Sequence, residues 1–296
     1  IIALNRKGAA PVGFREALAW SLAWVLLAFV FCAALWLGLD ASNGRAVANL
    51  KATEFLTGYL IEKSLSVDNI FVFLMLFSAF AVPAELQKRA LIIGVIGAII
   101  LRAVMILIGA WMIARFHWIL YLFGAFLLAT GVKMLIFAEH EPDLEKNPIL
   151  RWMRGHLTIS RHYLGERLWL RENGLRLFSP LFVVVVLIGV TDVIFAVDSI
   201  PAIFAITTDP FIVMTSNLFA VLGLRALYFL LAGMAERFHL LKYGLAVVLA
   251  FIGVKMLIVD FFKIPVFVSL AVVAAILVVS MAVSLLVPPR TARSRS

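Results

Sequence analysis

The chain has 296 residues, of which 64% are hydrophobic and only 15% are charged, and its mean hydropathy is +1.07. These values exclude an ordinary soluble domain and indicate a protein that crosses a membrane several times. The net charge of +9 does not indicate nucleic-acid binding, because the sequence offers no soluble domain to carry a basic face. Cys32 is the single cysteine, which excludes an internal disulfide and a thiolate metal site.

Eight stretches of the chain have roughly the 20 apolar residues that a helix needs to cross the hydrocarbon core of a bilayer. In chain order the predicted spans are 18–38, 54–80, 88–112, 118–138, 180–206, 211–234, 240–262 and 265–287. An even number of spans places both chain ends on one face, and most Lys and Arg residues outside the spans fall on that face. The positive-inside rule therefore predicts that both ends, including the C-terminus, are cytoplasmic.

An internal repeat organises these spans. The stretch "RFHWILYLFGAFLLATGVKMLI" (115–136) returns as "RFHLLKYGLAVVLAFIGVKMLI" (237–258), 122 positions later. Leu101-Arg102 likewise matches Leu224-Arg225, and "EKSLSVDNI" (62–70) matches "DVIFAVDSI" (192–200). Each repeat holds three spans, so the second repeat enters the membrane from the opposite face. We therefore predict an all-α membrane protein built on an inverted repeat, which is typical of transporters.

The repeat divides the chain into five parts. The first three-helix repeat is 54–138, the second is 180–262, and 139–179 is a mixed-charge linker in which "NPILRWMRGHL" (147–157) predicts a short amphipathic helix at the membrane surface. Residues 1–53 hold a stub and a flanking span, and 263–296 hold the last span and a basic tail. The stub begins "IIALNRKG", without Met, and we interpret it as the end of a further span or of a disordered segment.

Acidic residues inside two of the spans are the main functional signal. Glu62 aligns with Asp192, and Asp68 aligns with Asp198. An ionisable group at bilayer depth costs at least about 2.5–3.5 kcal/mol on insertion scales, so these acids need a partner or a ligand. Two interpretations stay open: the acids line an ion pathway, or they form structural ion pairs.

Intramembrane bases could neutralise these acids. Lys63 is a candidate, and Lys133 and Lys255 lie near span ends, from which a lysine can reach water. Arg102 and Arg225 lie near mid-span. We expect the two arginines to pair with the acids when no ion is bound, and thus to compensate charge or couple transport, although a structural role is open.

The spacing of the acids bears on the geometry of the site. Six residues of α-helix turn by about 240° and rise about 9 Å, so Glu62 and Asp68 do not share one face of a straight helix. In the second repeat Pro201 is expected to interrupt the helix and to free the carbonyl of Val197 beside Asp198. A freed carbonyl beside a carboxylate is a suitable ligand for a hard cation.

Neutral oxygens lie near the acids in sequence. Asn69 and Ser199 each follow an aspartate, and Asn217 lies on the next span. Oxygen ligands without thiolates favour Mg²⁺, Ca²⁺ or Mn²⁺ over Zn²⁺ or Cu⁺. We predict a midplane metal site shared by Asp68 and Asp198, with the other acids marking the approaches from the two sides. The full set of candidate metal ligands is Asp68, Asp198, Glu62, Asp192, Asn69, Ser199 and Asn217.

Catalysis is not favoured by the motifs. An intramembrane aspartyl protease also places two aspartates on neighbouring helices, but "GVTD" (189–192) lacks the second glycine of its Gly-x-Gly-Asp pattern. No phosphate-binding glycine loop appears. We therefore expect no enzymatic activity and no cofactor, and any transport should be secondary or passive.

Three stretches carry a family resemblance: "EKSLSVDN" (62–69), "DVIFAVDSIPAIFAITTDPFIVMTSNLFAVLGLRALYFLLAG" (192–233) and "RFHLLKYGLAVVLAFIGVKMLIVDFF" (237–262). They resemble the TerC family of bacterial inner-membrane proteins, most closely its Alx-like branch. The resemblance covers nearly the whole chain and implies manganese export and one more N-terminal span. It places the family's acidic motif residues on Glu62, Asp68, Asp192 and Asp198. Relatives usually carry an acid where this chain has Gly189, which puts coupling or affinity in doubt.

The expected function is export of Mn²⁺ from the cytoplasm across the bacterial inner membrane, by alternating access of the two halves, with protons as the candidate counter-ion. Another divalent cargo such as Ca²⁺ and a metal-binding membrane scaffold without transport are the alternatives. An oxyanion carrier is disfavoured, because four acids face only two well-buried arginines in the predicted core. The expected partners are a divalent cation and the lipid bilayer, and the sequence does not indicate an oligomeric state.

Overall fold

The computed structural model describes residues 13–116, 118–136, 148–172, 175–231 and 240–287, without the side chains of Asp68, Phe71, Glu172 and Leu175. The stub 1–12, the start of the linker at 139–147 and the basic tail 288–296 lie outside the described residues. Predictions that concern these segments or the Asp68 side chain therefore stay predictions.

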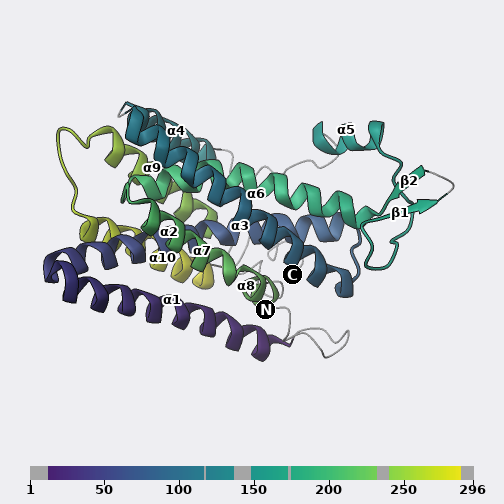
Figure 1. Cartoon of the computed structure of the whole chain (residues 1–296), viewed down its shortest axis with the longest axis horizontal. Helices are drawn as coiled ribbons and strands as arrows, with labels where there is room; N and C mark the ends of the chain where they lie inside the picture. Colours follow the sequence, from purple (N-terminus) through teal and green to yellow (C-terminus); the bar gives the residue numbers. More distant parts are fainter. Residues whose placement is uncertain (1–12, 117, 137–147, 173–174, 232–239, 288–296) are drawn as a thin grey trace.

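Long helices make up most of the described chain (Figure 1). They are α1 (Phe14–Asn43), α2 (Arg45–Ala79), α3 (Ala84–Arg115), α4 (Ile119–Ile136), α6 (Pro180–Phe204), α7 (Pro210–Leu222), α8 (Leu224–Leu231), α9 (Leu241–Leu257) and α10 (Val266–Leu286). Each predicted span overlaps a helix. Within the described residues, six helical stretches are long and apolar enough to cross a bilayer, with α7 and α8 counted as one stretch. The all-α fold of a polytopic membrane protein is confirmed.

Local sequence signals explain where the second-half helices begin. The side chain of Ser179 accepts a hydrogen bond from the backbone N–H of Leu181, and Pro180 occupies the first turn of α6. Asp209 caps α7 in the same way through the N–H of Phe211, again with a proline at the first position. Both pairs combine a polar N-cap with a proline whose missing N–H costs nothing there.

The linker between the repeats is partly as expected. The short amphipathic helix is confirmed as α5 (Pro148–His156). A hairpin of β1 (Trp169–Glu172) and β2 (Leu175–Phe178), in which Trp169 pairs with Phe178, was not predicted. The sequence signal was the Asn-Gly dipeptide at 173–174, which is typical of two-residue hairpin turns.

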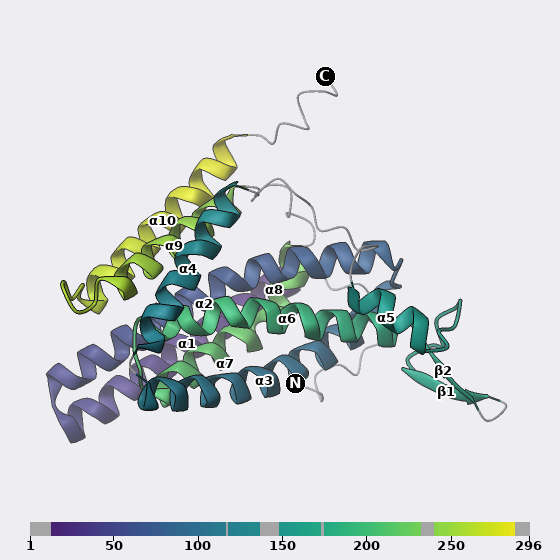
Figure 2. The same cartoon turned by 90° about the horizontal axis from the view of Figure 1, so that it is seen from above.

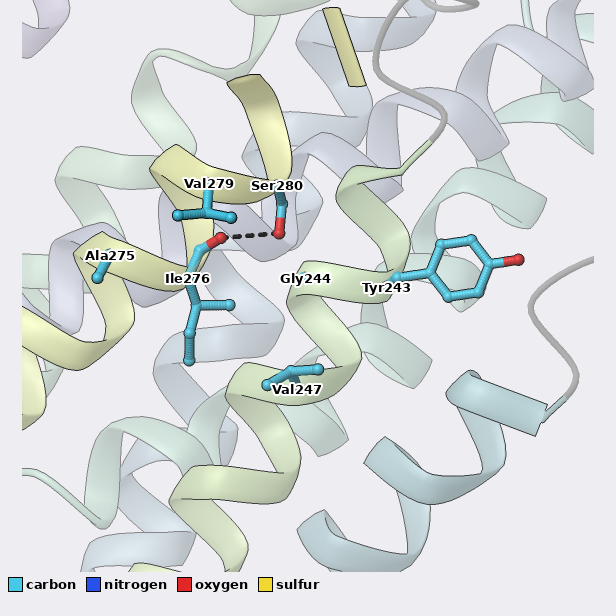
Figure 3. Close-up of a pocket in the computed structure, with 7 residues that line it drawn as sticks. All are labelled: Tyr243, Gly244, Val247, Ala275, Ile276, Val279 and Ser280. Atoms are coloured by element: carbon cyan, nitrogen blue, oxygen red, sulfur yellow. Dashed lines mark hydrogen bonds between the residues drawn. The ribbon is translucent and has the colours of Figure 1, made fainter. Parts of the chain in front are cut away.

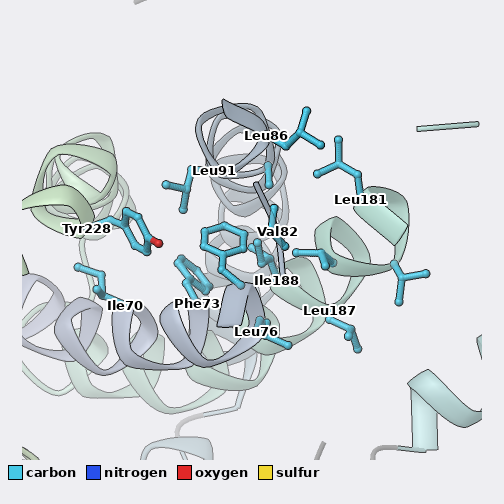
Figure 4. Close-up of a cluster of buried hydrophobic side chains, with 14 of the residues drawn as sticks. Ile70, Phe73, Leu76, Val82, Leu86, Leu91, Leu181, Leu187, Ile188 and Tyr228 are labelled. Carbon is cyan, nitrogen blue, oxygen red and sulfur yellow. The ribbon is translucent and has the colours of Figure 1, made fainter. Parts of the chain in front are cut away.

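A cluster of buried apolar side chains packs the helix bundle together at the end that lies near the linker. Figure 4 shows Phe73 and Leu76 of α2, Leu91 of α3, Leu181 of α6 and Tyr228 of α8 converging in one buried cluster. The phenol of Tyr228 packs edge-on against Phe77 and donates a hydrogen bond to Gln87 of α3. This cluster holds the ends of α2, α3, α6 and α8 together.

Equivalent helices of the two repeats cross each other at α4 and α9, which form a group with α10 inclined to the other long helices (Figure 2). Small residues allow the backbones of α4 and α9 to touch. A Cβ on Gly131 would lie 2.7 Å from the carbonyl oxygen of Ala246, and a Cβ on Gly253 would lie 2.8 Å from that of Gly124. These two contacts join the same pair of repeat positions in reciprocal order, as a two-fold relation requires. The helices run antiparallel, which agrees with inversion, while the inverted repeat as a whole stays a prediction.

The expected interruption at Pro201 is wrong. Helix α6 continues through Pro201 to Phe204, so the proline lies only in the last turn. The second repeat is instead broken one helix later, where Gly223 separates α7 from α8. Its partner in the first repeat, α3, is continuous over 32 residues.

Candidate ion site

Two acids and one arginine meet in the middle of the helix bundle. The guanidinium of Arg102, on α3, donates to both carboxylate oxygens of Asp192 on α6, through Nε at 3.0 Å and Nη2 at 2.8 Å. Its Nη1 donates to the carboxylate of Glu62 on α2. The side chains of all three residues are at most 2% exposed. A single guanidinium therefore bridges an acid from each repeat.

Two amides complete this arrangement. Nδ2 of Asn217, on α7, donates to the second oxygen of Glu62 at 3.0 Å. Nδ2 of Asn69, about two turns further along the same face of α2, reaches Asp192 at 3.5 Å, the limit of a hydrogen bond. We call Glu62, Arg102, Asp192, Asn69 and Asn217 the charged centre.

The electrostatics of the charged centre are unbalanced. Two carboxylates and one guanidinium leave a formal charge of −1 when all three are ionised. Removing one partner of a buried ion pair typically costs about 3–5 kcal/mol, because a buried charge is left unpaired. Lys63 follows Glu62 directly, but its Nζ donates to the carbonyl of Ala220 at 3.3 Å instead. Arg102 is thus the base that pairs with both acids here.

Buried oxygens without partners lie on the same helix faces. Oδ1 of Asn69, Oγ of Ser66 and Oγ of Ser199 have no hydrogen-bond partner among the described residues. Residues 62, 66 and 69 share one face of α2, and Asp192 and Ser199 are likewise seven positions apart on α6. Unpaired oxygens beside two carboxylates are the donor set that a hard cation uses.

The structure redistributes the predicted site residues. Glu62 and Asp192 meet on Arg102, so their expected placement on opposite approaches is wrong. The physical reason is that Glu62 and Asp192 face the helix interface. The positions six residues later are rotated by about 240° around each helix and so face another direction. Asp198 is half-buried against α4, where it accepts a hydrogen bond from Thr130 and has Lys133 nearby. The expected proximity of Asp198 to Asp68 stays a prediction.

The two arginines also differ. Arg102 pairs with the acids, as expected of an empty site. Arg225, on α8, is half-buried, and no hydrogen bond or ion pair joins it to another residue in the described part of the chain. Among the described residues no group of three or more His, Cys, Asp or Glu side chains could hold a metal ion by itself. A cation in the charged centre would therefore use two carboxylates and neutral oxygens.

A second charged cluster was missed by sequence reasoning. Nζ of Lys51 bridges the carboxylates of Glu54 and Asp209 at 3.0 Å each, and the hydroxyl of Thr207 donates to Glu54 at 2.7 Å. We call these four residues the distal network, because they lie at the helix ends far from the linker. Glu54 is eight residues before Glu62 and was overlooked because it stands at the edge of a predicted span.

Asp209 of the distal network has a lowered pKa. Partial burial alone would raise this pKa, but the hydrogen bond and charge of Lys51, together with the backbone N–H groups of Phe211 and Ile212, outweigh it. The carboxylate is therefore held ionised by the same lysine that joins α2 to α7.

A groove of about 400 Å³ lies between α9 and α10 and shares no lining residue with either charged cluster (Figure 3). It is lined by Tyr243, Gly244, Val247, Ala275, Ile276, Val279 and Ser280. Ser280 donates to the carbonyl of Ile276 within its own helix, so the groove offers mainly apolar surface. This groove is not suited to an ion.

Residues 47–292 match the family described as "Integral membrane protein TerC family". The chain belongs to the TerC family. It is 60% identical over 276 residues to "Putative membrane-bound redox modulator Alx" of Escherichia coli (strain K12), covering 93% of this chain and 86% of the relative. It is 49% identical over 275 residues to "Uncharacterized membrane protein STKORF319" of Myxococcus xanthus, with coverage of 93% and 84%. No solved structure matches it. This TerC-family chain is therefore an Alx-like integral membrane protein with bacterial relatives.

Proposed function

We propose that this TerC-family protein is a secondary transporter of a divalent cation, with the charged centre as its binding site. The observation that carries the proposal is that Glu62 and Asp192, one acid from each repeat, meet on the buried guanidinium of Arg102. Repeat-based transporters bind their substrates where the repeats meet. Glu62, Asp192 and the free oxygen of Asn69 would hold the ion.

The guanidinium of Arg102 and an incoming cation would compete for the same two carboxylates. A buried pair of carboxylates needs a positive partner, because unpaired like charges in one apolar site are costly. The guanidinium supplies that partner in the empty site. An incoming ion must displace it, so ion binding and movement of Arg102 are linked. A resident base that competes with the ion lowers the net affinity of the acids for it and so favours release.

The cargo that we propose is Mn²⁺, exported from the cytoplasm across the bacterial inner membrane, with the C-terminus in the cytoplasm. Carboxylate and amide oxygens suit Mn²⁺ and equally suit Ca²⁺, so Mn²⁺ rests on the family resemblance. Protons are the proposed counter-ion. Asp198 is the candidate carrier, because it is a half-buried acid outside the charged centre, with the hydroxyl of Thr130 and the ammonium of Lys133 near it.

The name of the Escherichia coli relative refers to redox modulation. We assign no thiol redox step to this chain. Cys32 is its single cysteine, it is buried, and its Sγ lies 3.7 Å from the carbonyl oxygen of Ala52 within the contact of α1 and α2. A cation exporter could still affect redox state in a cell by changing the supply of a metal to other proteins.

Transport of ⁵⁴Mn²⁺ into inside-out membrane vesicles tests the proposal. The wild type should accumulate the isotope, and Glu62→Gln or Asp192→Asn should reduce the initial rate by at least about tenfold, since each removes a charged hard ligand while keeping its size. Asp40→Asn is the matched control, because Asp40 pairs with Arg45 at an exposed helix end. Binding of Mn²⁺ without accumulation would overturn transport and favour the scaffold, and preferential competition by Ca²⁺ would reassign the cargo.

A further inference from the structure

The two repeats place equivalent arginines in different surroundings. Arg102 and Arg225 align in the repeat, yet Arg102 is 1% exposed and bridges both acids. Arg225 is half-buried and makes no hydrogen bond or ion pair with the part of the chain that the structure describes. One repeat thus supplies the counter-cation of the charged centre and the other does not.

A one-residue interruption of the helix precedes Arg225 and has no counterpart at Arg102. Helix α3 runs unbroken through Arg102, whereas α7 ends at Leu222, and Arg225 follows the break at Gly223 by two residues. Lys63 stabilises the break by donating to the carbonyl of Ala220 in the last turn of α7, where backbone carbonyls lack helical partners. A Cβ on Gly223 would lie 2.6 Å from Nζ of Lys63. The ammonium therefore occupies the space beside the break.

Unlike the two arginines, both equivalent acids lie in the charged centre. Glu62 and Asp192 are each other's equivalents, so an exchange of conformation between the repeats leaves the acid pair in place and swaps the arginines. The reciprocal contacts of Gly131 with Ala246 and of Gly253 with Gly124 show that part of the interface already obeys such a relation. In transporters built on inverted repeats, alternating access is largely a movement of one repeat against the other around a fixed site.

We propose that Arg102 and Arg225 alternate as the counter-cation of Glu62 and Asp192. In the state that opens to the other face, α7 and α8 join into one helix, Arg225 enters the charged centre and Arg102 withdraws. This inference rests on the proposed function, and it assigns one arginine to each facing state of the empty carrier.

The proposal separates two kinds of transport. An empty carrier can change its facing state only if an arginine pairs with the acids in each state, because an unpaired buried carboxylate is costly. A loaded carrier needs neither arginine, since the ion itself supplies the positive charge. Net transport requires the empty carrier to return, whereas exchange of internal for external Mn²⁺ uses the loaded carrier alone.

The test compares these two modes in proteoliposomes. Arg225→Gln should lower net ⁵⁴Mn²⁺ uptake by at least about tenfold, because the return step loses its counter-charge. Exchange of ⁵⁴Mn²⁺ against unlabelled Mn²⁺ should stay within about twofold of the wild type, because the loaded carrier is already neutral. Arg225→Lys, which keeps the charge, should recover part of the net uptake. Arg89→Gln, which alters an exposed pair with Glu166, is the control and should change neither mode.

The outcomes are distinguishable. A wild type that moves no Mn²⁺ in either mode would overturn the proposed function itself. Normal net uptake by Arg225→Gln would overturn the alternation and leave the acid site standing. Loss of both modes, or failure of both Arg225→Gln and Arg225→Met to reach the membrane folded, would give Arg225 a structural role and overturn the inference.

Discussion

The crossing of α4 and α9 and the charged centre join the same two repeats in opposite ways. At the crossing the contacts are reciprocal: Gly131 meets Ala246, and Gly253 meets Gly124. At the charged centre Arg102 binds both acids, while its equivalent Arg225 binds neither. A symmetric contact looks the same after the repeats exchange conformation, whereas an asymmetric one is changed. The contacts at the crossing can therefore stay the same in both conformations, whereas the contacts at the charged centre differ between them.

The largest expected effect is an unequal response of the two arginines to removal of their charge. Arg102→Met should lower the free energy of unfolding by about 3–5 kcal/mol, because it leaves two buried carboxylates without their base. Arg225→Met should cost less than about 1 kcal/mol, since a half-exposed base without a partner contributes little. Unfolding of purified protein in mixed micelles with increasing denaturing detergent measures both.

A triple variant serves as the matched control for Arg102. Combining Arg102→Met with Glu62→Gln and Asp192→Asn removes the unpaired charges, and it should recover much of the lost stability. Equal costs for the two single arginine variants would contradict the asymmetry of the charged centre.

The second prediction concerns the symmetric region. Gly131→Ala and Gly253→Ala should each cost about 1–3 kcal/mol, because the new methyl group would force two backbones apart. A Cβ at Gly131 would lie 2.7 Å from the oxygen of Ala246, and one at Gly253 would lie 2.6 Å from the backbone nitrogen of Leu128. The two costs should agree within about 0.5 kcal/mol, as expected for equivalent contacts. Gly97→Ala is the control, since open space surrounds Gly97.

Much of this fold was predictable because its signals are local. Apolar length defines a span, and the repeated stretch that ends in "GVKMLI" identifies α4 and α9 as equivalents. The same stretch placed the crossing glycines, although the sequence does not show that they touch. The break at Gly223 was not predicted, because Gly223 stands inside an apolar run and a helix tolerates a single glycine. The side chain that donates to the carbonyl of Ala220 beside the break is Lys63, a residue far away in sequence.

The charged centre was predicted in its members but not in its arrangement. Glu62, Asp192 and Arg102 were predicted as site residues because they are ionisable positions inside predicted spans, and the repeat showed that the two acids are equivalent. The pairing of Arg102 with acids was expected, but the meeting of Glu62 and Asp192 was not, because the shared site was predicted at Asp68 and Asp198. Helical phase favours the actual arrangement, since Glu62 and Asn69 are seven residues apart and share a face. Which helices meet at that face is decided by tertiary packing.

The third prediction separates stability from ion binding at two unpaired buried oxygens, those of Asn69 in the charged centre and of Ser199 on α6. Ser199→Ala removes a buried hydroxyl that has no described partner, so the free energy of unfolding should change by less than about 1 kcal/mol and can rise. Asn69→Leu removes the free amide oxygen and should weaken Mn²⁺ binding more than Ser199→Ala, because Asn69 also touches Asp192. Titration calorimetry with Mn²⁺ measures the binding, and unchanged affinity of Asn69→Leu would remove this residue from the site.

The smallest expected effect lies in the distal network, which extends the asymmetry to the helix ends. Glu54 has no acidic counterpart, since the aligned position in the second repeat is Val184. The pKa of Asp209 is lowered in the folded protein, so the folded state binds this proton less tightly than the unfolded state. The resulting stabilisation is fully present above the ordinary value of 3.8 and is lost as the pH falls through the lowered pKa. Because the Asp209 side chain is 33% exposed, solvent screening keeps the contribution below about 1 kcal/mol.

Asp209→Asn keeps a good helix cap and loses only the charge. The difference in unfolding free energy between this variant and the wild type should therefore be seen at pH 6 and should shrink below about pH 3.5. A constant difference across this range would show that Asp209 acts through its helix cap and not through Lys51.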